Sequence, residues 1–403
     1  MKENRYISSR QAGRIDYIDG IRGVCAIIVL ICHLVDVFLP EWNGIVEYRN
    51  RVEQLYYGSP LHFLSDGSFA VCFFFVLSGY LITRKVYINN RIVISPIKTY
   101  IKLYHIIVPA VLFSALLMAT HQMYHIEASR VDPQLSFVLD YNSFNPTVKS
   151  VIKDVFFNSF FLSSIYVGPF WTIKYEFINT LIMMLIAFYA FRCKNRQFVF
   201  LFSFILSFFW SQYLPSFFAG AIVFDLSICN NTNNQRISQC ISKLKRNKVG
   251  KVVCAFILLF GLYLALCNSS FSGIWIPLQI LKSISFFTVA KIKTLGILLA
   301  FLYISVFDWP KKLLNNKITV WLGRISPFIY AFHWPIILSV GCGVYLLLYN
   351  TVLNYYVLVV LISVIVVLTT MFISIIVNNC SIIIIKKEKK LIDYLKKKIY
   401  NRQ

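Results

Sequence analysis

Charged side chains are scarce in this sequence, and acidic ones are scarcer than basic ones. Asp, Glu, Lys and Arg make up 14% of the 403 residues, with 17 acidic against 40 basic, whereas about a quarter of the residues in soluble domains are charged. Hydrophobic residues make up 58%, and the mean hydropathy is +0.67. This composition predicts a multi-pass membrane protein. The basic residues lie between apolar spans, so we expect no nucleic-acid partner.

Several motifs are absent as well. The sequence has no Cys-x-x-Cys and no paired Cys/His spacing, so we expect no metal site. Most cysteines lie in apolar runs and are expected to be buried, reduced thiols. No small-residue cleavage site follows the basic N-terminus, which indicates a retained anchor rather than a signal peptide. No internal repeat is visible, so an inverted-repeat transporter gains no support.

The long apolar runs predict an all-α bundle of about ten transmembrane helices. Residues 1–20 would form a cytoplasmic N-terminus, 21–385 the membrane domain and 386–403 a basic cytoplasmic tail, since most basic residues fall on one side of the spans. Residues 276–293, interrupted by lysines, could be interfacial or re-entrant. The spans are expected at 21–40, 66–84, 104–120, 169–191, 197–213, 215–229, 252–268, 294–308, 327–349 and 354–385.

The first span carries an arginine at its mouth and a histidine inside it. His33 follows Arg22 by eleven residues, which on a helix corresponds to roughly 16 Å, about halfway through a hydrocarbon core of ~30 Å. An ionisable ring at that depth indicates a specific function, although a hydrogen bond to a neighbouring helix is an equal alternative. Asp36 shares the helix face of His33 and could orient the ring, or simply lie at the interface.

Other polar residues lie where a membrane helix does not need them. Arg84 ends the second span near the expected depth of Arg22, and the two could clamp a phosphate-bearing donor, although topology alone explains each arginine. Glu176 is expected nearer the outer surface, where a lone carboxylate suggests function. His333 lies nine residues after Arg324, which places its imidazole at a depth similar to that of His33.

These stretches resemble, in order, the signatures of the acyltransferase-3 family of membrane O-acyltransferases. Arg22 and His33 match its arginine, ten residues, histidine pattern. The other three matches are the run from Phe74 to Arg84, the segment Trp171 to Glu176 and the segment Tyr330 to Pro335. The resemblance covers about residues 15–345, and Lys102 and His105 stand where the family often has a basic pair.

The resemblance implies transfer of an acyl group, acetyl by default, from acyl-coenzyme A to a polysaccharide such as O-antigen, with no permanently bound cofactor. It implies a bacterial inner-membrane protein that meets membrane lipids and a lipid-linked or polymeric glycan. We expect a stand-alone member without the hydrolase-like domain that some members carry, so transfer would be completed alone or with a separate periplasmic transferase. The expected roles are catalysis by His33 and Glu176, donor binding by Asp19, Arg22, Ser78 and Arg84, and acceptor binding or support by Trp171, Tyr330 and His333.

Two other classes of function fit the residues. A lipid-linked glycan flippase or polymerase is also a large aromatic-rich bundle, but needs no coenzyme A. A proton-coupled transporter could use His33, His333 and Glu176 as a relay.

Overall fold

The computed structural model describes residues 13–89, 96–231, 235–282, 284, 286–351 and 354–400, and within these ranges the elements are helices joined by loops. Eight of the described helices are long and apolar enough to cross a membrane, and two shorter apolar helices accompany them. The prediction of an all-α membrane bundle is therefore confirmed. We call the membrane face at which α1 (Asp16–Phe38) begins the proximal face, and the opposite one the distal face.

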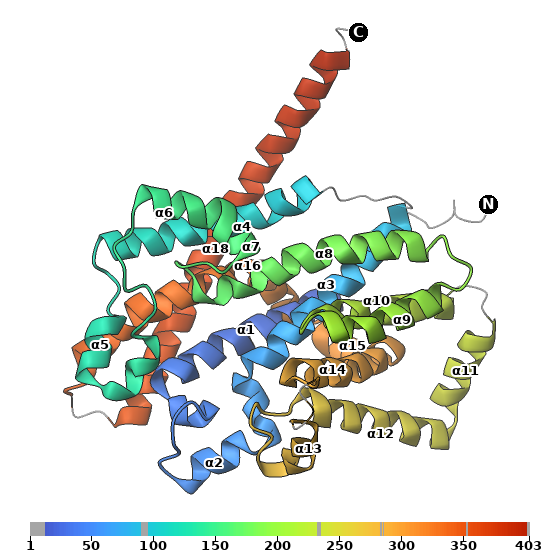
Figure 1. The fold of residues 1–403 in the computed structure, drawn as a ribbon, viewed down its shortest axis with the longest axis horizontal. Helices are drawn as coiled ribbons and strands as arrows, with labels where there is room; N and C mark the ends of the chain where they lie inside the picture. Colours follow the sequence, from blue (N-terminus) through green and yellow to red (C-terminus); the bar gives the residue numbers. More distant parts are fainter. Residues whose placement is uncertain are drawn as a thin grey trace.

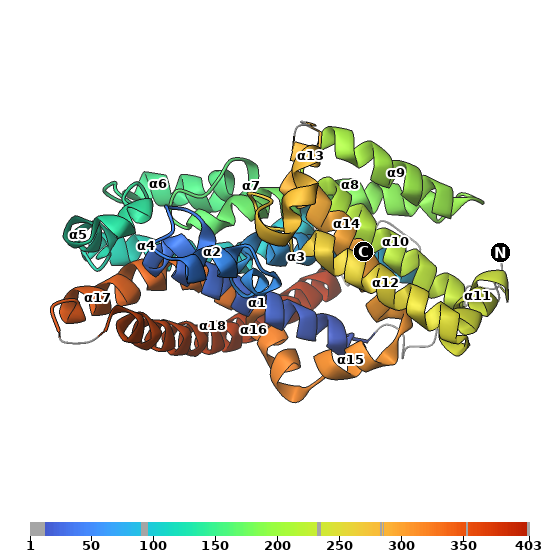
Figure 2. The same cartoon turned by 90° about the horizontal axis from the view of Figure 1, so that it is seen from below.

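The helices surround a central group made of α1, α3 (Gly67–Asn89) and α16 (Lys317–Ile336). In Figure 2, α8 (Trp171–Ala190) and α9 (Arg196–Trp210) lie on one side of α1 and α3, and α18 (Tyr355–Tyr400) lies on the other. The remaining long helices are α4 (Pro96–Ala119), α10 (Leu214–Asn231), α12 (Lys248–Ala265) and α14 (Val289–Val306). At its C-terminal end α18 projects beyond the bundle (Figure 1).

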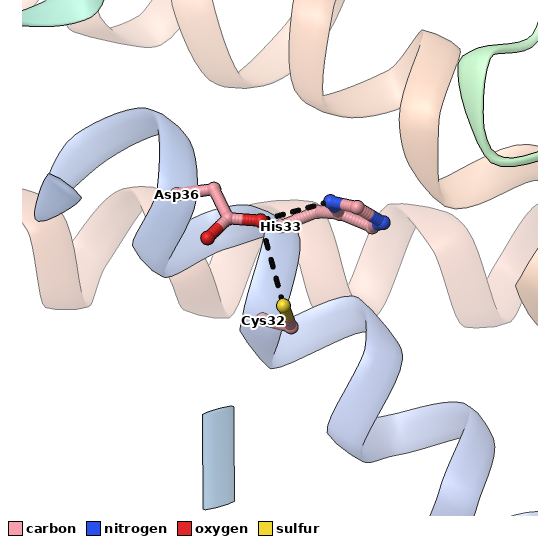
Figure 3. Close-up of side chains that lie close together, drawn as sticks. All are labelled: Cys32, His33 and Asp36. Carbon is pink, nitrogen blue, oxygen red and sulfur yellow. Dashed lines mark hydrogen bonds and ion pairs between the residues drawn. The ribbon is translucent and has the colours of Figure 1, made fainter. Parts of the chain in front are cut away.

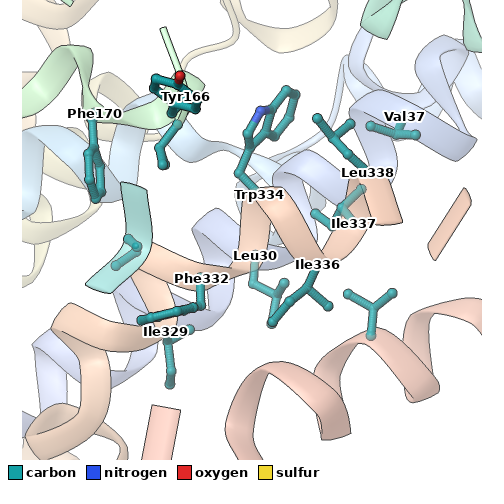
Figure 4. Packing of buried hydrophobic residues seen from close by; sticks show 14 of the residues in the cluster. Leu30, Val37, Tyr166, Phe170, Ile329, Phe332, Trp334, Ile336, Ile337 and Leu338 are labelled. Carbon is teal, nitrogen blue, oxygen red and sulfur yellow. The ribbon is translucent and has the colours of Figure 1, made fainter. Parts of the chain in front are cut away.

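Glycines allow α1 and α16 to pack with their backbones in contact. A Cβ atom added to Gly323 would lie 1.9 Å from the backbone oxygen of Asp19, and one added to Gly23 would lie 2.5 Å from that of Thr319. Only glycine permits such an approach. Further along the same seam, apolar side chains such as Leu30 and Phe332 fill the space between the two helices (Figure 4). This packing sets the register in which α1 faces α16.

Several spans begin earlier than the sequence predicted, and the reason is visible for two of them. The helix expected from 327 begins at Lys317, where the Asn316 side chain accepts hydrogen bonds from two backbone N–H groups and caps it. The helix expected from 294 begins at Val289 and includes Lys293, which is buried and paired with Asp66. A lysine that has a buried partner does not end a span, and sequence hydropathy cannot register that partner.

The region expected to be ambiguous forms short helices before α14. It contains the 3-10 helix η8 (Gly273–Leu278) and the four-residue α13 (Gln279–Lys282). The basic segment from 386 continues α18 as far as Tyr400, so its described part is one helix with the last span.

Short helices occupy the two connections that leave the distal ends of α1 and α4, and the second connection reaches back along α4, where the Phe156 carbonyl accepts a hydrogen bond from the Tyr100 hydroxyl. The connection from α1 to α3 contains η3 (Pro40–Asn43), α2 (Arg51–Tyr57) and η4 (Pro60–Ser65). The longer connection from α4 to α8 contains α5 (His125–Val131), η5 (Pro133–Val138), α6 (Val148–Lys153), η6 (Asp154–Asn158), α7 (Ser159–Phe161) and η7 (Gly168–Phe170). Buried Asp154 anchors it by accepting hydrogen bonds from the Ser164 hydroxyl at 2.6 Å and the Ile165 N–H at 2.9 Å.

Candidate active site

His33 lies in the distal half of α1 with one ring nitrogen against a carboxylate. Its Nδ1 is 3.1 Å from Oδ2 of Asp36 (Figure 3). The same oxygen accepts from the Cys32 thiol at 3.4 Å, and the other carboxylate oxygen accepts from Nδ2 of Asn43 at 2.6 Å. An ionised carboxylate only accepts hydrogen bonds, so Nδ1 carries the proton and Nε2 presents a lone pair. Asp36 was expected either to orient the His33 ring or to lie at the membrane interface, and this contact fits the first role.

The cluster has a second chemical feature that the sequence spacing did not indicate. Cys32, His33 and Asp36 each offer a metal-ligand atom, and these atoms lie within 4.8 Å of one another. All three residues come from one stretch of α1 and do not form a Cys-x-x-Cys or a paired Cys/His motif. The hydrogen bonds that Cys32 and His33 make to Asp36 are enough to account for their closeness. The expectation that the protein has no metal site stays a prediction.

A second imidazole and an indole flank His33. The ring of His333, on α16, stacks on that of His33 with centroids 5.2 Å apart and an angle of 16° between the planes. Trp334 meets His33 edge-on, also at 5.2 Å. Nδ1 of His333 donates to the Ile329 carbonyl at 3.1 Å, which leaves Nε2 as an acceptor. This Nε2 and the indole N–H of Trp334 are buried and lack hydrogen-bond partners among the described residues.

A cavity of about 200 Å³ lies on the proximal side of this cluster, between α1, α3, α4, α8 and α16. Its polar lining includes Arg22, Ser78, Lys102 and Glu176, and its other walls are mostly apolar. The Ser78 hydroxyl donates to Oε1 of Glu176 at 2.9 Å. Lys102 is also exposed at the surface of the helix bundle. Two cations and one carboxylate thus face a largely apolar space.

Tyr330 stands between the cavity and the histidines. It lines the cavity, and its ring centroid is 5.7 Å from that of His333. Its hydroxyl donates to the Pro169 carbonyl at 2.7 Å and lies 2.8 Å from Oγ1 of Thr172. His33 does not line the cavity, and Glu176 is bonded to Ser78 rather than to either imidazole. In the described part of the chain, no hydrogen bond joins His33, His333 and Glu176, the three groups of the proton-relay alternative.

The other candidate residues lie outside the cavity. Arg84 donates to the Gly13 carbonyl at 2.8 Å, and buried Asp19 forms an ion pair with Arg14. The ring of Trp171 packs 5.4 Å from that of Tyr213, beyond the cavity lining. The structure therefore unites Arg22, Ser78, Glu176 and Tyr330 around one space, and His33 with His333 in a neighbouring cluster.

Three residues at the site were missed or left without a role by the sequence reasoning. Lys102 lines the cavity, and the basic position before Pro109 was the available signal for it. Trp334 follows His333 directly and lay within a recognised segment. Asn43 contacts Asp36 from a short loop helix, and no pattern in the sequence distinguishes it from other loop asparagines.

A multi-pass membrane bundle with a carboxylate-oriented histidine beside a cationic cavity defines the class of this protein. The profile of the acyltransferase 3 family, described as an acyltransferase domain, matches residues 15–378, and the chain belongs to that family. The protein is therefore a membrane acyltransferase, as the motifs indicated. No curated protein and no solved structure matches the chain.

Proposed function

We propose that the protein transfers an acyl group, namely acetyl, from acyl-coenzyme A to a hydroxyl of a cell-surface polysaccharide such as O-antigen or another exported glycan. In this proposal it lies in the bacterial inner membrane with its proximal face and both termini in the cytoplasm. The excess of lysine and arginine in the segments at the proximal face supports that orientation. Coenzyme A is a substrate here, and no cofactor stays bound.

The cavity is suited to the donor. Arg22 and Lys102 present positive charge at its proximal end, where the phosphates of coenzyme A would bind. The apolar walls would accommodate the acyl thioester. Glu176, beside Ser78, would accept a hydrogen bond from an amide N–H of the pantetheine arm. Asp19 and Arg84 lie at the same face outside the cavity, where the nucleotide end of the donor would extend.

The observation that carries the proposal is the contact of 3.1 Å between Nδ1 of His33 and Asp36. It leaves Nε2 free to act as a general base, which is the arrangement that hydroxyl activation requires. His33 Nε2 would take the proton of a sugar hydroxyl as its oxygen attacks the thioester carbonyl carbon. The carbon–sulfur bond then breaks, and the departing thiolate of coenzyme A receives the proton from the imidazolium.

The acceptor would approach from the distal face. Trp171, half-buried near that face, offers an aromatic surface for a pyranose ring. The unpartnered Nε2 of His333 could accept a hydrogen bond from a second sugar hydroxyl. Tyr330 separates the cavity from His33, so the mechanism requires its side chain to turn aside when the thioester advances.

The test compares His33→Ala with His121→Ala, which removes an exposed histidine with a positive φ outside the site. Both variants are expressed at matched membrane abundance in the native host, and O-acetylation of the surface glycan is measured by mass spectrometry. We expect loss of acetyl groups with His33→Ala alone. Wild-type acetylation in that variant would overturn the assignment. Purified protein that neither binds acyl-coenzyme A nor releases thiol when given acceptor would favour the flippase or polymerase.

A further inference from the structure

The connection from α1 to α3 folds back onto the His33 site. Three of its residues, Asn43, Ser65 and Tyr56, form a chain of hydrogen bonds that leads to Asp36. Nδ2 of Asn43 donates to Oδ1 of Asp36 at 2.6 Å. The Ser65 hydroxyl donates to Oδ1 of the same asparagine at 2.7 Å, and the Tyr56 hydroxyl lies 2.9 Å from Ser65 Oγ. We propose that Asn43, held by Ser65 and Tyr56, is a positioning residue that fixes Asp36 and, through it, the tautomer of His33. This inference rests on the role of His33 as the base.

The direction of each hydrogen bond follows from the chemistry of the groups. The Ser65 hydroxyl lies 2.7 Å from Oδ1 of Asn43 and 3.4 Å from the His62 carbonyl oxygen, so its one hydrogen goes to the nearer Asn43. Tyr56 then donates to Ser65. Because its carbonyl oxygen accepts from Ser65, Asn43 must turn its NH₂ group towards Asp36. With Asn43 donating to Oδ1 and the Cys32 thiol donating to Oδ2, both carboxylate oxygens act as acceptors, and the His33 nitrogen that faces Oδ2 is then the one that carries the hydrogen.

Reversing the Asn43 amide would place its carbonyl oxygen against the Asp36 carboxylate, an unfavourable contact between two acceptors. Ser65 and Tyr56 thus hold the Asn43 amide in one orientation. Both Asp36 and Ser65 are buried, so water is a poor substitute for these contacts.

Loss of the Asn43 contact would release Oδ1 of Asp36 and let the carboxylate turn about its own axis. Cys32 already competes with His33 for Oδ2, at 3.4 Å against 3.1 Å. Once Asp36 turns, Nδ1 of His33 loses its acceptor, and the proton can settle on Nε2, where it blocks the base. Binding of the donor does not use this contact, so the effect belongs to the chemical step.

The kinetic test uses a double-variant cycle of Asn43→Ala and Asp36→Asn. We expect Asn43→Ala to lower kcat about ten- to a hundredfold, the factor that loss of a hydrogen bond to a charged group produces, with KM for acyl-coenzyme A unchanged. In the Asp36→Asn background it should cause no further loss, because the two residues act through one path. Independent, additive losses would overturn the proposal.

The matched control is Asn50→Ala, which removes the side-chain cap of α2 in the same loop without touching the chain of hydrogen bonds. It should leave kcat near the wild-type value, because the contacts of Asn50 lie in the first turn of α2, away from Asn43 and Ser65. A fall as large as that of Asn43→Ala would mean that loop integrity is what matters, and would overturn the positioning role.

A second readout does not depend on turnover. In protein with ¹⁵N-labelled histidine, the His33 signal, assigned by its absence in His33→Ala, should report Nδ1–H in the wild type and a shift towards Nε2–H in Asn43→Ala. An unchanged tautomer would overturn the positioning role even if the enzyme is active. If the tautomer shifts but His33→Ala still acetylates the glycan, the proposed function fails and the structural inference stands.

Discussion

Substitution of Gly323 by alanine tests whether the close seam between α1 and α16 organises the site. The added Cβ would lie 1.9 Å from the carbonyl oxygen of Asp19 and 2.5 Å from its carbonyl carbon, both backbone atoms. Ordinary carbon–oxygen contacts lie at about 3.3 Å or more, so the helices must separate by roughly 1 Å. Overpacking of this kind costs about 1–3 kcal/mol.

The same separation should disturb catalysis more than it disturbs the fold. α1 carries His33 and Arg22, while α16 carries Tyr330 and His333, so the two halves of the site would move apart. A misplacement of about 1 Å can reduce the rate about a hundredfold. We therefore expect Gly323→Ala to lower the unfolding temperature in detergent by several degrees, and to lower acyl-coenzyme A-dependent thiol release by at least tenfold at equal protein.

Gly341→Ala provides the matched control on the distal continuation of the same helix. Its Cβ would first meet the side-chain ends of Val366 at 3.2 Å and Phe38 at 3.3 Å, which can shift by a few tenths of an ångström. Its unfolding temperature and activity should stay near those of the wild type. A Gly323→Ala protein that matches the wild type in both assays would refute the backbone contact, and with it the described register of α1 and α16.

The other predictions concern the distal face. Burial lowers the pKa of His62 to about 4, so between pH 6.5 and 4 the unfolded chain takes up a proton that the folded protein does not. Stability is unaffected by His62 above pH 6.5 and should fall by up to about 3 kcal/mol as the pH drops towards 4. His62→Gln should flatten that part of the pH profile of thermal stability, and an unchanged profile would contradict the burial argument. Asp66→Asn should destabilise the protein by about 3–5 kcal/mol by leaving buried Lys293 without its counter-ion. Adding Lys293→Met should restore much of the loss in the same unfolding assay, and a double variant as unstable as the single one would contradict the pairing. Trp171→Ala should raise KM for the glycan about two- to tenfold, the value of one aromatic contact, while KM for acyl-coenzyme A stays constant; equal changes in both would argue against an acceptor contact.

The sequence identified the ionisable residues that lie within membrane-spanning helices. A span that contains Arg22 and His33 stands out because polar groups in hydrocarbon are costly, and the helical rise converts their spacing into depth. The same reasoning set His333 at a depth similar to that of His33, and the structure shows in addition that the two rings stack. Glu176 was recognised as unusual and expected nearer the outer surface in a catalytic role, and the structure bonds it to Ser78 in the cavity that Arg22 lines.

Hydropathy and motif order by themselves determined that this chain is a helical membrane acyltransferase. They also identified the polar side chains that lie within apolar spans. Both results follow from the sequence because hydropathy and motifs are properties of each helix taken separately. Only the tertiary structure decided that Glu176 faces the cavity, that Tyr330 separates the cavity from the histidines, and that Asn43 holds Asp36. Those relations depend on the rotation and register of helices distant in sequence, which are set by close contacts such as that of Gly323 with Asp19. The sequence of a single span does not show which neighbouring helix it will pack against.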